Sequence, residues 1–157
     1  MRLLTLLALL ALWGCDNGPL AGSLSELFPL TVAREELIRN NEAFQVSYYA
    51  NRNRGEDLVA QVSVSLYGVN FVPGARVALE GEYSPGHPRT TVVHLAVGEP
   101  TRTMPLVSKG TLDLSSGGAP LQLTSGDFNL AFVSDGTYGS GRTLRGNFGG
   151  RALDGGF

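Results

Sequence analysis

Acidic and imidazole side chains are the first residues of this chain to consider for chemistry. Glu80 and Glu82 are two positions apart, so an extended strand would place both carboxylates on one face, about 7 Å apart. Carboxylates at such a distance can hydrolyse glycosidic bonds, and a solvated strand face explains the same pair without any chemistry. His87 falls in a predicted loop and His94 on the more polar face of a predicted strand, and neither has further ligands at zinc-binding spacing.

Nucleophile and phosphate motifs are also missing from the sequence. It contains no G-x-S-x-G turn, no glycine-rich phosphate loop ending in Lys, and no EF-hand loop. No residue therefore receives a catalytic or metal-binding assignment. We expect a protein that is not an enzyme and that uses no cofactor.

Tyrosines are the best candidates for binding a ligand. The chain has five of them, and Tyr49 and Tyr67 fall on the less apolar faces of two predicted strands. An exposed tyrosine ring offers an apolar face for stacking and a hydroxyl for hydrogen bonding, which suits the recognition of sugars. Tyr49 and Tyr67 are therefore candidate ligand-binding residues, and burial in the core or at its rim is the alternative.

The N-terminus carries the most specific pattern of the sequence. Arg2 precedes ten mostly apolar residues, half of the ~20 that a membrane-spanning helix needs, which is typical of a signal peptide. This run ends in Leu12-Trp13-Gly14-Cys15, which resembles the lipobox of bacterial lipoproteins. The resemblance implies cleavage before Cys15 and attachment of acyl chains to it. Two or three such chains hold a protein stably on a membrane, at ~0.8 kcal/mol per buried CH₂.

Charge and cysteine content limit the classes of partner and of covalent bond that this chain can have. The chain has 12 Lys and Arg against 14 Asp and Glu, so it lacks the basic excess of a nucleic-acid-binding protein. Cys15 is the only cysteine, which excludes an intramolecular disulfide. We expect a cell-envelope protein that acyl chains on Cys15 hold to the inner or the outer membrane, facing the periplasm or the cell surface.

The expected role is non-enzymatic, either binding or structural, with an envelope protein or a glycan as the partner. A carbohydrate-binding module that uses Tyr49 and Tyr67 is the first alternative, and an enzyme with an unrecognised site is the second. The sequence by itself does not separate these possibilities.

The rest of the chain is typical of an all-β domain. Its 21 glycines and 8 prolines favour many turns, and 43% apolar residues suffice for a packed core. Apolar and polar residues alternate, most clearly at 58–67, where Leu58, Ala60, Val62 and Val64 share one predicted face. We expect an antiparallel β-sandwich or small barrel of about nine short strands, with at most one short helical turn near the N-terminus.

Other strand candidates cover 44–51, 76–83, 90–97, 103–107, 111–114, 121–124, 127–133 and 143–148, and Pro105 makes 103–107 a candidate edge strand. Residues 30–39 combine helix formers with a following Asn-Asn turn, so strand and helix both stay open there, with strand favoured. The predicted organisation is a signal peptide at 1–14, the lipidated Cys15 with a short tether over 15–23, and one β domain over 24–157.

Overall fold

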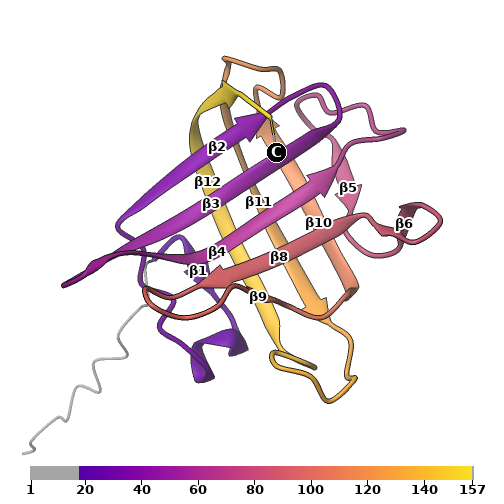
Figure 1. Ribbon diagram of the computed structural model, residues 1–157. Coiled ribbons are helices and arrows are strands. Elements are labelled where there is room, and N and C mark those ends of the chain that lie inside the picture. The colour runs from indigo at the N-terminus through magenta and orange to yellow at the C-terminus, as the bar shows by residue number, and fades with distance from the viewer. Residues whose placement is uncertain (1–17, 157) are drawn as a thin grey trace, which may run out of the picture.

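The computed structural model describes residues 18–156, and strands make up nearly all of the regular secondary structure in this part of the chain (Figure 1). Its one short helical element is the 3₁₀ turn η1 (Ser23–Glu26), which lies near the N-terminus. The all-β class and the single helical turn predicted from the sequence are therefore confirmed. The strands are β1 (Leu20–Ala21), β2 (Arg34–Arg39), β3 (Ala43–Arg52), β4 (Gly55–Ser65), β5 (Arg76–Ala78), β6 (Glu82–Ser84), β7 (His87–Pro88), β8 (Thr90–Leu95), β9 (Arg102–Thr103), β10 (Val107–Ser116), β11 (Leu123–Phe132) and β12 (Thr143–Asp154).

The main sheet has the strand order β5-β10-β11-β12-β2-β3-β4-β8-β9, and β1 adds to β12. Its pairings are antiparallel except for that of β12 with β2. Strand β12 belongs to two layers, because residues 143–151 pair with β11 and residues 152–154 pair with β2. The sheet thereby curls, and in Figure 1 strands β2, β3, β4 and β8 cross over β10, β11 and β12. The hairpin of β6 and β7 forms a separate small sheet.

The core lies between the two layers. Phe44 and Tyr48 of β3 point inward and are fully buried, as the alternation in the sequence predicts. The Phe44 ring lies 5.1 Å from the ring of Phe148 in β12, and the Tyr48 ring lies 6.3 Å from that of Phe128 in β11. The Tyr48 hydroxyl donates a hydrogen bond of 2.8 Å to the carbonyl of Asn147. These contacts join the layers, and each buried aromatic ring contributes about 1.5–3 kcal/mol.

A β-bulge in β4 corrects the predicted alternation. Tyr48 pairs with Ala60, but the next residue, Tyr49, pairs with Leu58, so Val59 is inserted between the two pairs. Val59 and Ala60 are both buried, as the two residues of a bulge that share one face would be. Leu58 therefore lies on the outer face beside Tyr49, and its predicted place on the core face is wrong.

The face of β8 that points to the core is the opposite of the one expected from the sequence. Thr90, Val92 and His94 are buried, whereas Thr91 and Val93 are half-buried on the outer face. Both sets of residues are partly apolar, so alternation alone does not distinguish the faces. His94 is therefore a core residue and not the solvated one predicted.

The segment 76–83 is not one strand. Strand β5 ends at Ala78, and Gly81 adopts a φ of +80° and turns the chain. The Glu80 carboxylate accepts a hydrogen bond of 3.0 Å from the amide of Gly110, while Glu82 begins the β6–β7 hairpin. Glu80 and Glu82 therefore do not share a strand face. Residues 30–39, for which the sequence left both strand and helix possible, contain strand β2, so the favoured prediction of a strand is confirmed.

The residues after position 18 are part of the domain. Leu20 is buried and pairs with Gly146 of β12, and the backbone amide and hydroxyl of Ser23 contact the Thr143 hydroxyl. The predicted tether over 15–23 therefore extends too far along the chain, since its last residues contribute to the sheet and to the core. Cys15 lies outside the described residues.

Candidate functional site

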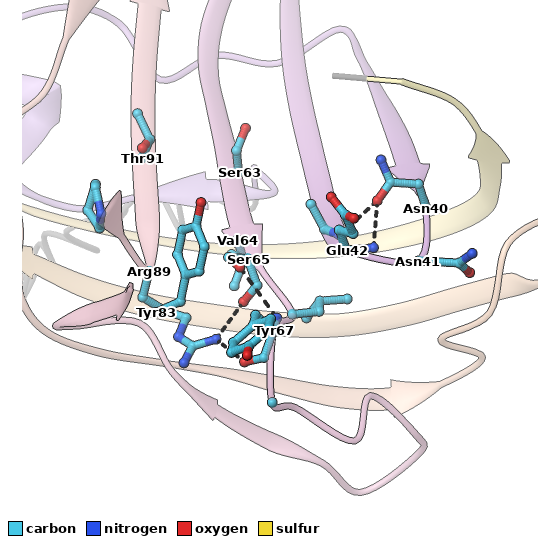
Figure 2. Close-up of a pocket in the computed structure, with 14 residues that line it drawn as sticks. Asn40, Asn41, Glu42, Ser63, Val64, Ser65, Tyr67, Tyr83, Arg89 and Thr91 are labelled. Carbon is cyan, nitrogen blue, oxygen red and sulfur yellow. Dashed lines mark hydrogen bonds between the residues drawn. The ribbon is translucent and has the colours of Figure 1, made fainter. Parts of the chain in front are cut away.

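A hollow of about 690 Å³ opens on the outer face of the sheet. It lies where the β2–β3 turn, the end of β4, the β6–β7 hairpin and the start of β8 meet. Figure 2 shows Tyr67 and Tyr83 on one side and Asn41 and Glu42 on the other, with Ser63 further along β4. We call this site the tyrosine hollow.

Tyr67 and Tyr83 form the aromatic side of the tyrosine hollow, and the His87 ring packs against Tyr83 outside it. The Tyr67 and Tyr83 ring centroids are 6.3 Å apart, with an angle of 50° between their planes. The His87 ring lies 5.6 Å from Tyr83 on the β6–β7 hairpin, whose turn contains Gly86 at a φ of +77°. Tyr67 is 70% exposed, so its ring is open to contact with a ligand.

Arg89 fixes the backbone that carries Tyr67. Its Nη1 donates hydrogen bonds of 3.0 Å to the carbonyl of Ser65 and 2.8 Å to the carbonyl of Tyr67 (Figure 2). The Ser65 amide in turn donates to the Arg89 carbonyl at 2.9 Å, and the Arg89 amide donates to the carbonyl of Gly81. The end of β4 and the base of the hairpin are therefore bound to each other, and the backbone at Tyr67 is held in place.

The polar side is presented by the β2–β3 turn. The Asn40 side-chain oxygen accepts hydrogen bonds from the amides of Glu42 and Ala43, at 2.9 and 2.8 Å, in an Asx turn. Its side-chain nitrogen donates to the carbonyl of Gly155 at 3.2 Å. Asn40 is therefore a positioning residue, and the exposed Asn41 and Glu42 are the groups that a ligand could reach.

The floor consists of small polar residues on the outer faces of β4 and β8, among them Ser63 and Thr91. The Ser63 hydroxyl donates a hydrogen bond of 3.0 Å to Gln45 Oε1. Beyond the hollow, the side-chain amides of Gln45 and Gln61 both donate to the hydroxyl of Ser47, at 3.4 and 3.2 Å. Gln45 and Ser47 are buried, so their hydrogen bonds give the floor a fixed polar surface.

The residues that line the tyrosine hollow suit binding better than catalysis. They include one carboxylate, Glu42, and one cation, Arg89, so their formal charges cancel. They include no second acid and no nucleophile beside a base, which hydrolysis or acyl transfer would require. The site can hydrogen-bond a polar ligand and stack against one of its faces.

The two tyrosines singled out from the sequence lie at different places. Tyr67 forms part of the hollow, but Tyr49 pairs with Leu58, nine positions before Tyr67, or about 30 Å away along an extended chain. The guanidinium of Arg34 lies 3.7 Å from the centre of the Tyr49 ring and is also bonded to Glu56 at 2.8 Å. Tyr49 is therefore covered by a cation held in place, and it is not part of the same site.

Several residues of the hollow were not identified from the sequence. They are Asn41, Glu42 and Arg89, which belong to segments that the sequence indicates only as turns or strand ends. Tyr83 was one of the five tyrosines considered for stacking, without a predicted neighbour. The polar Asn-Asn turn and the Pro-Gly loop were the signals available, but neither shows that the two segments meet.

The remaining sequence candidates do not form a second site. His94 stacks on Phe28 at 3.9 Å, and its Nδ1 lies 3.0 Å from the carbonyl of Val59 in the core. No group of three His, Cys, Asp or Glu side chains within residues 18–156 could hold a metal ion. None of the helices found in that range is long and apolar enough to cross a membrane.

Comparisons with protein-family models, with curated protein sequences and with solved structures find no match for this chain.

Proposed function

We propose that this chain is a lipid-anchored, non-enzymatic binding protein of the bacterial cell envelope, and that its ligand occupies the tyrosine hollow. The observation that carries the proposal is the exposed Tyr67 ring, which extends at the rim of a polar hollow from a backbone segment that Arg89 fixes. Because that backbone is already fixed, ligand binding has only the side chain left to order. The lipobox-like motif that ends at Cys15 supplies the anchor.

The position of the hollow fits such an anchor. Cys15 is three residues from Gly18, at most about 11 Å of chain, so acyl chains on Cys15 would keep β1 near the bilayer. Strand β1 pairs with Gly146, whereas Asp154, eight residues further along β12, pairs with Arg39 beside the hollow. Eight residues of strand span about 27 Å. The hollow is therefore well separated from the anchored end and open to ligands away from the anchoring membrane.

Photocrosslinking in living cells tests the binding site. A photoreactive amino acid replaces Thr91, on the floor of the hollow, in the full-length lipoprotein, and a control protein carries it at Arg54, in the exposed β3–β4 turn. We expect an adduct from position 91 that Tyr67→Ala removes and Tyr138→Ala leaves, because Tyr138 is a half-exposed ring outside the hollow. Equal labelling from both positions, or labelling that Tyr67→Ala does not change, would show that the hollow is not the binding site.

Metabolic labelling tests the anchor. A labelled fatty acid should be incorporated into the wild-type protein, and Cys15→Ala should abolish the label and leave an uncleaved precursor. Because Cys15 is the only cysteine, the lipidated protein should show no free thiol after unfolding. An unlabelled wild-type protein with one free thiol would refute the lipid anchor.

A further inference from the structure

The tyrosine hollow also indicates the chemical class of its ligand. We infer that this ligand is a neutral glycan chain, with the face of one sugar ring packed on Tyr67 and its hydroxyls bonded to Asn41 and Glu42. The inference rests on the proposed function, since it names the ligand of the same site.

The aromatic side fits the apolar face of a sugar. A pyranose ring carries C–H groups on its faces and hydroxyls around its edge, so it needs an apolar surface bordered by hydrogen-bonding groups. Tyr67 supplies that surface at 70% exposure, and Tyr83 packs beside it at 6.3 Å. The Tyr83 ring blocks one side of Tyr67, which leaves the side toward the polar turn open (Figure 2).

The polar side fits the hydroxyl edge of the same sugar. The amide of Asn41 both donates and accepts hydrogen bonds, and the carboxylate of Glu42 accepts two or more. The Glu42 carbonyl accepts a hydrogen bond of 2.7 Å from the amide of Leu66, which ties the turn to the end of β4. Donors and acceptors therefore lie opposite the rings on a backbone that is held in place, which suits the vicinal hydroxyls of a sugar.

The charge of the site argues against an anionic ligand such as a phosphate. Arg89 is the one cation among the lining residues, and its Nη1 is already bonded to the carbonyls of Ser65 and Tyr67. Glu42 carries the opposite charge on the facing turn. A neutral ligand meets both groups without the repulsion that an anion would have from Glu42.

The strand pairing argues against an extended peptide. Strand β3 lies between β2 and β4, and β4 lies between β3 and β8, so the floor offers no free strand edge for a peptide to extend the sheet. A peptide laid across the floor would therefore gain no main-chain pairing with the sheet.

Chemical analysis of the adduct formed at position 91 tests the class of ligand. The crosslinked lipoprotein is purified under denaturing conditions and hydrolysed, and its sugars, amino acids, fatty acids and phosphate are compared with those of uncrosslinked protein. We expect sugars to be the component gained, and expect them to be missing from the Tyr67→Ala protein. A gain of peptide from another protein, or of lipid or phosphate without sugar, would overturn the glycan assignment while leaving the proposed binding site intact. No Tyr67-dependent adduct would instead refute the proposed function itself.

Affinity measurements with soluble oligosaccharides cut from that glycan test whether a sugar ring stacks on Tyr67. Tyr67→Ala should weaken binding to the detergent-purified lipoprotein about tenfold, the loss of one stacked ring. Tyr67→Phe keeps the ring and should stay within about twofold of the wild type. Binding that weakens equally in Tyr67→Phe and Tyr67→Ala, or that falls steeply as salt is added, would contradict ring stacking on a neutral ligand.

Discussion

Two glycines of β12 offer a sharp test of how tightly the layers pack. Gly146 lies between Phe128 of β11 and Leu20 of β1. A Cβ atom at Gly146 would lie 2.6 Å from two atoms of the Phe128 ring and 2.9 Å from the Leu20 side chain. At Gly149, three residues along the same strand, the nearest atom would be Ser125 Cβ, at 3.9 Å. Neither glycine has a positive φ, so alanine fits the backbone at both positions.

The expected cost follows from what would have to move. Phe128 and Leu20 are both 1% exposed, and the Phe128 ring packs against the fully buried Tyr48. Forcing a methyl group into such a site costs about 1–3 kcal/mol, against a gain of about 0.5–1 kcal/mol from the smaller entropy of the unfolded chain. We expect Gly146→Ala to lower the free energy of unfolding by about 1–2 kcal/mol. Gly149→Ala should leave it unchanged or raise it slightly.

Urea denaturation followed by circular dichroism measures this difference. With an m value of about 2 kcal/mol per molar urea for a domain of this size, the two midpoints should differ by about 1 M. If Gly146→Ala and Gly149→Ala unfold at the same urea concentration, then Phe128 does not pack over Gly146 and the assigned pairing of β11 with β12 is wrong.

Three further predictions concern stability. The buried Thr90 hydroxyl has no hydrogen-bond partner among residues 18–156, so Thr90→Val should raise the free energy of unfolding by about 1 kcal/mol; a lower urea midpoint would contradict this. The Arg52 side chain bonds Asp57 at 2.7 Å and lowers the pKa of that carboxyl. This contribution is complete at neutral pH and is lost as the pH falls below about 4, so Asp57→Asn should destabilise the protein at pH 7 and have little effect in acid. Val64 is 1% exposed and Val64→Asp should prevent folding, whereas Ser63→Asp, on the outer face, should still give a β-rich circular dichroism spectrum; equal damage would refute the assigned faces of β4.

The class of fold could be predicted because its cause is local. Along β3, Phe44 and Tyr48 point to the core as the alternation predicts, since successive side chains of a strand point to opposite faces whatever the strand pairs with. The turn at Asn40 could be predicted for the same reason, because the Asn40 side chain accepts hydrogen bonds from backbone amides of its own turn. Such features depend on neighbours within a few residues, so the sequence contains all that determines them.

Pairing between strands decided what alternation could not. The insertion of Val59 shifts Leu58 to the outer face, and this depends on the register of β4 against β3. The predicted strands 121–124 and 127–133 are one strand, β11, because Gly126 lets the Phe148 ring of β12 pack over it. A glycine that looks like a break in the sequence is here a place where a neighbouring ring approaches closely.

The tyrosine hollow shows the same limit most clearly. Tyr67 was a candidate from the sequence, but Tyr49, its expected companion, lies under Arg34 at the other end of the sheet. The groups that face Tyr67 instead come from the β2–β3 turn, about 25 positions earlier in the chain, and Tyr83 comes from a hairpin that follows it. The sequence by itself determined that these segments are turns and strand ends, because turn and strand propensities act locally. Only the pairing of β2, β3, β4 and β8 brought them around one hollow, since proximity between distant segments depends on register and curl of the whole sheet.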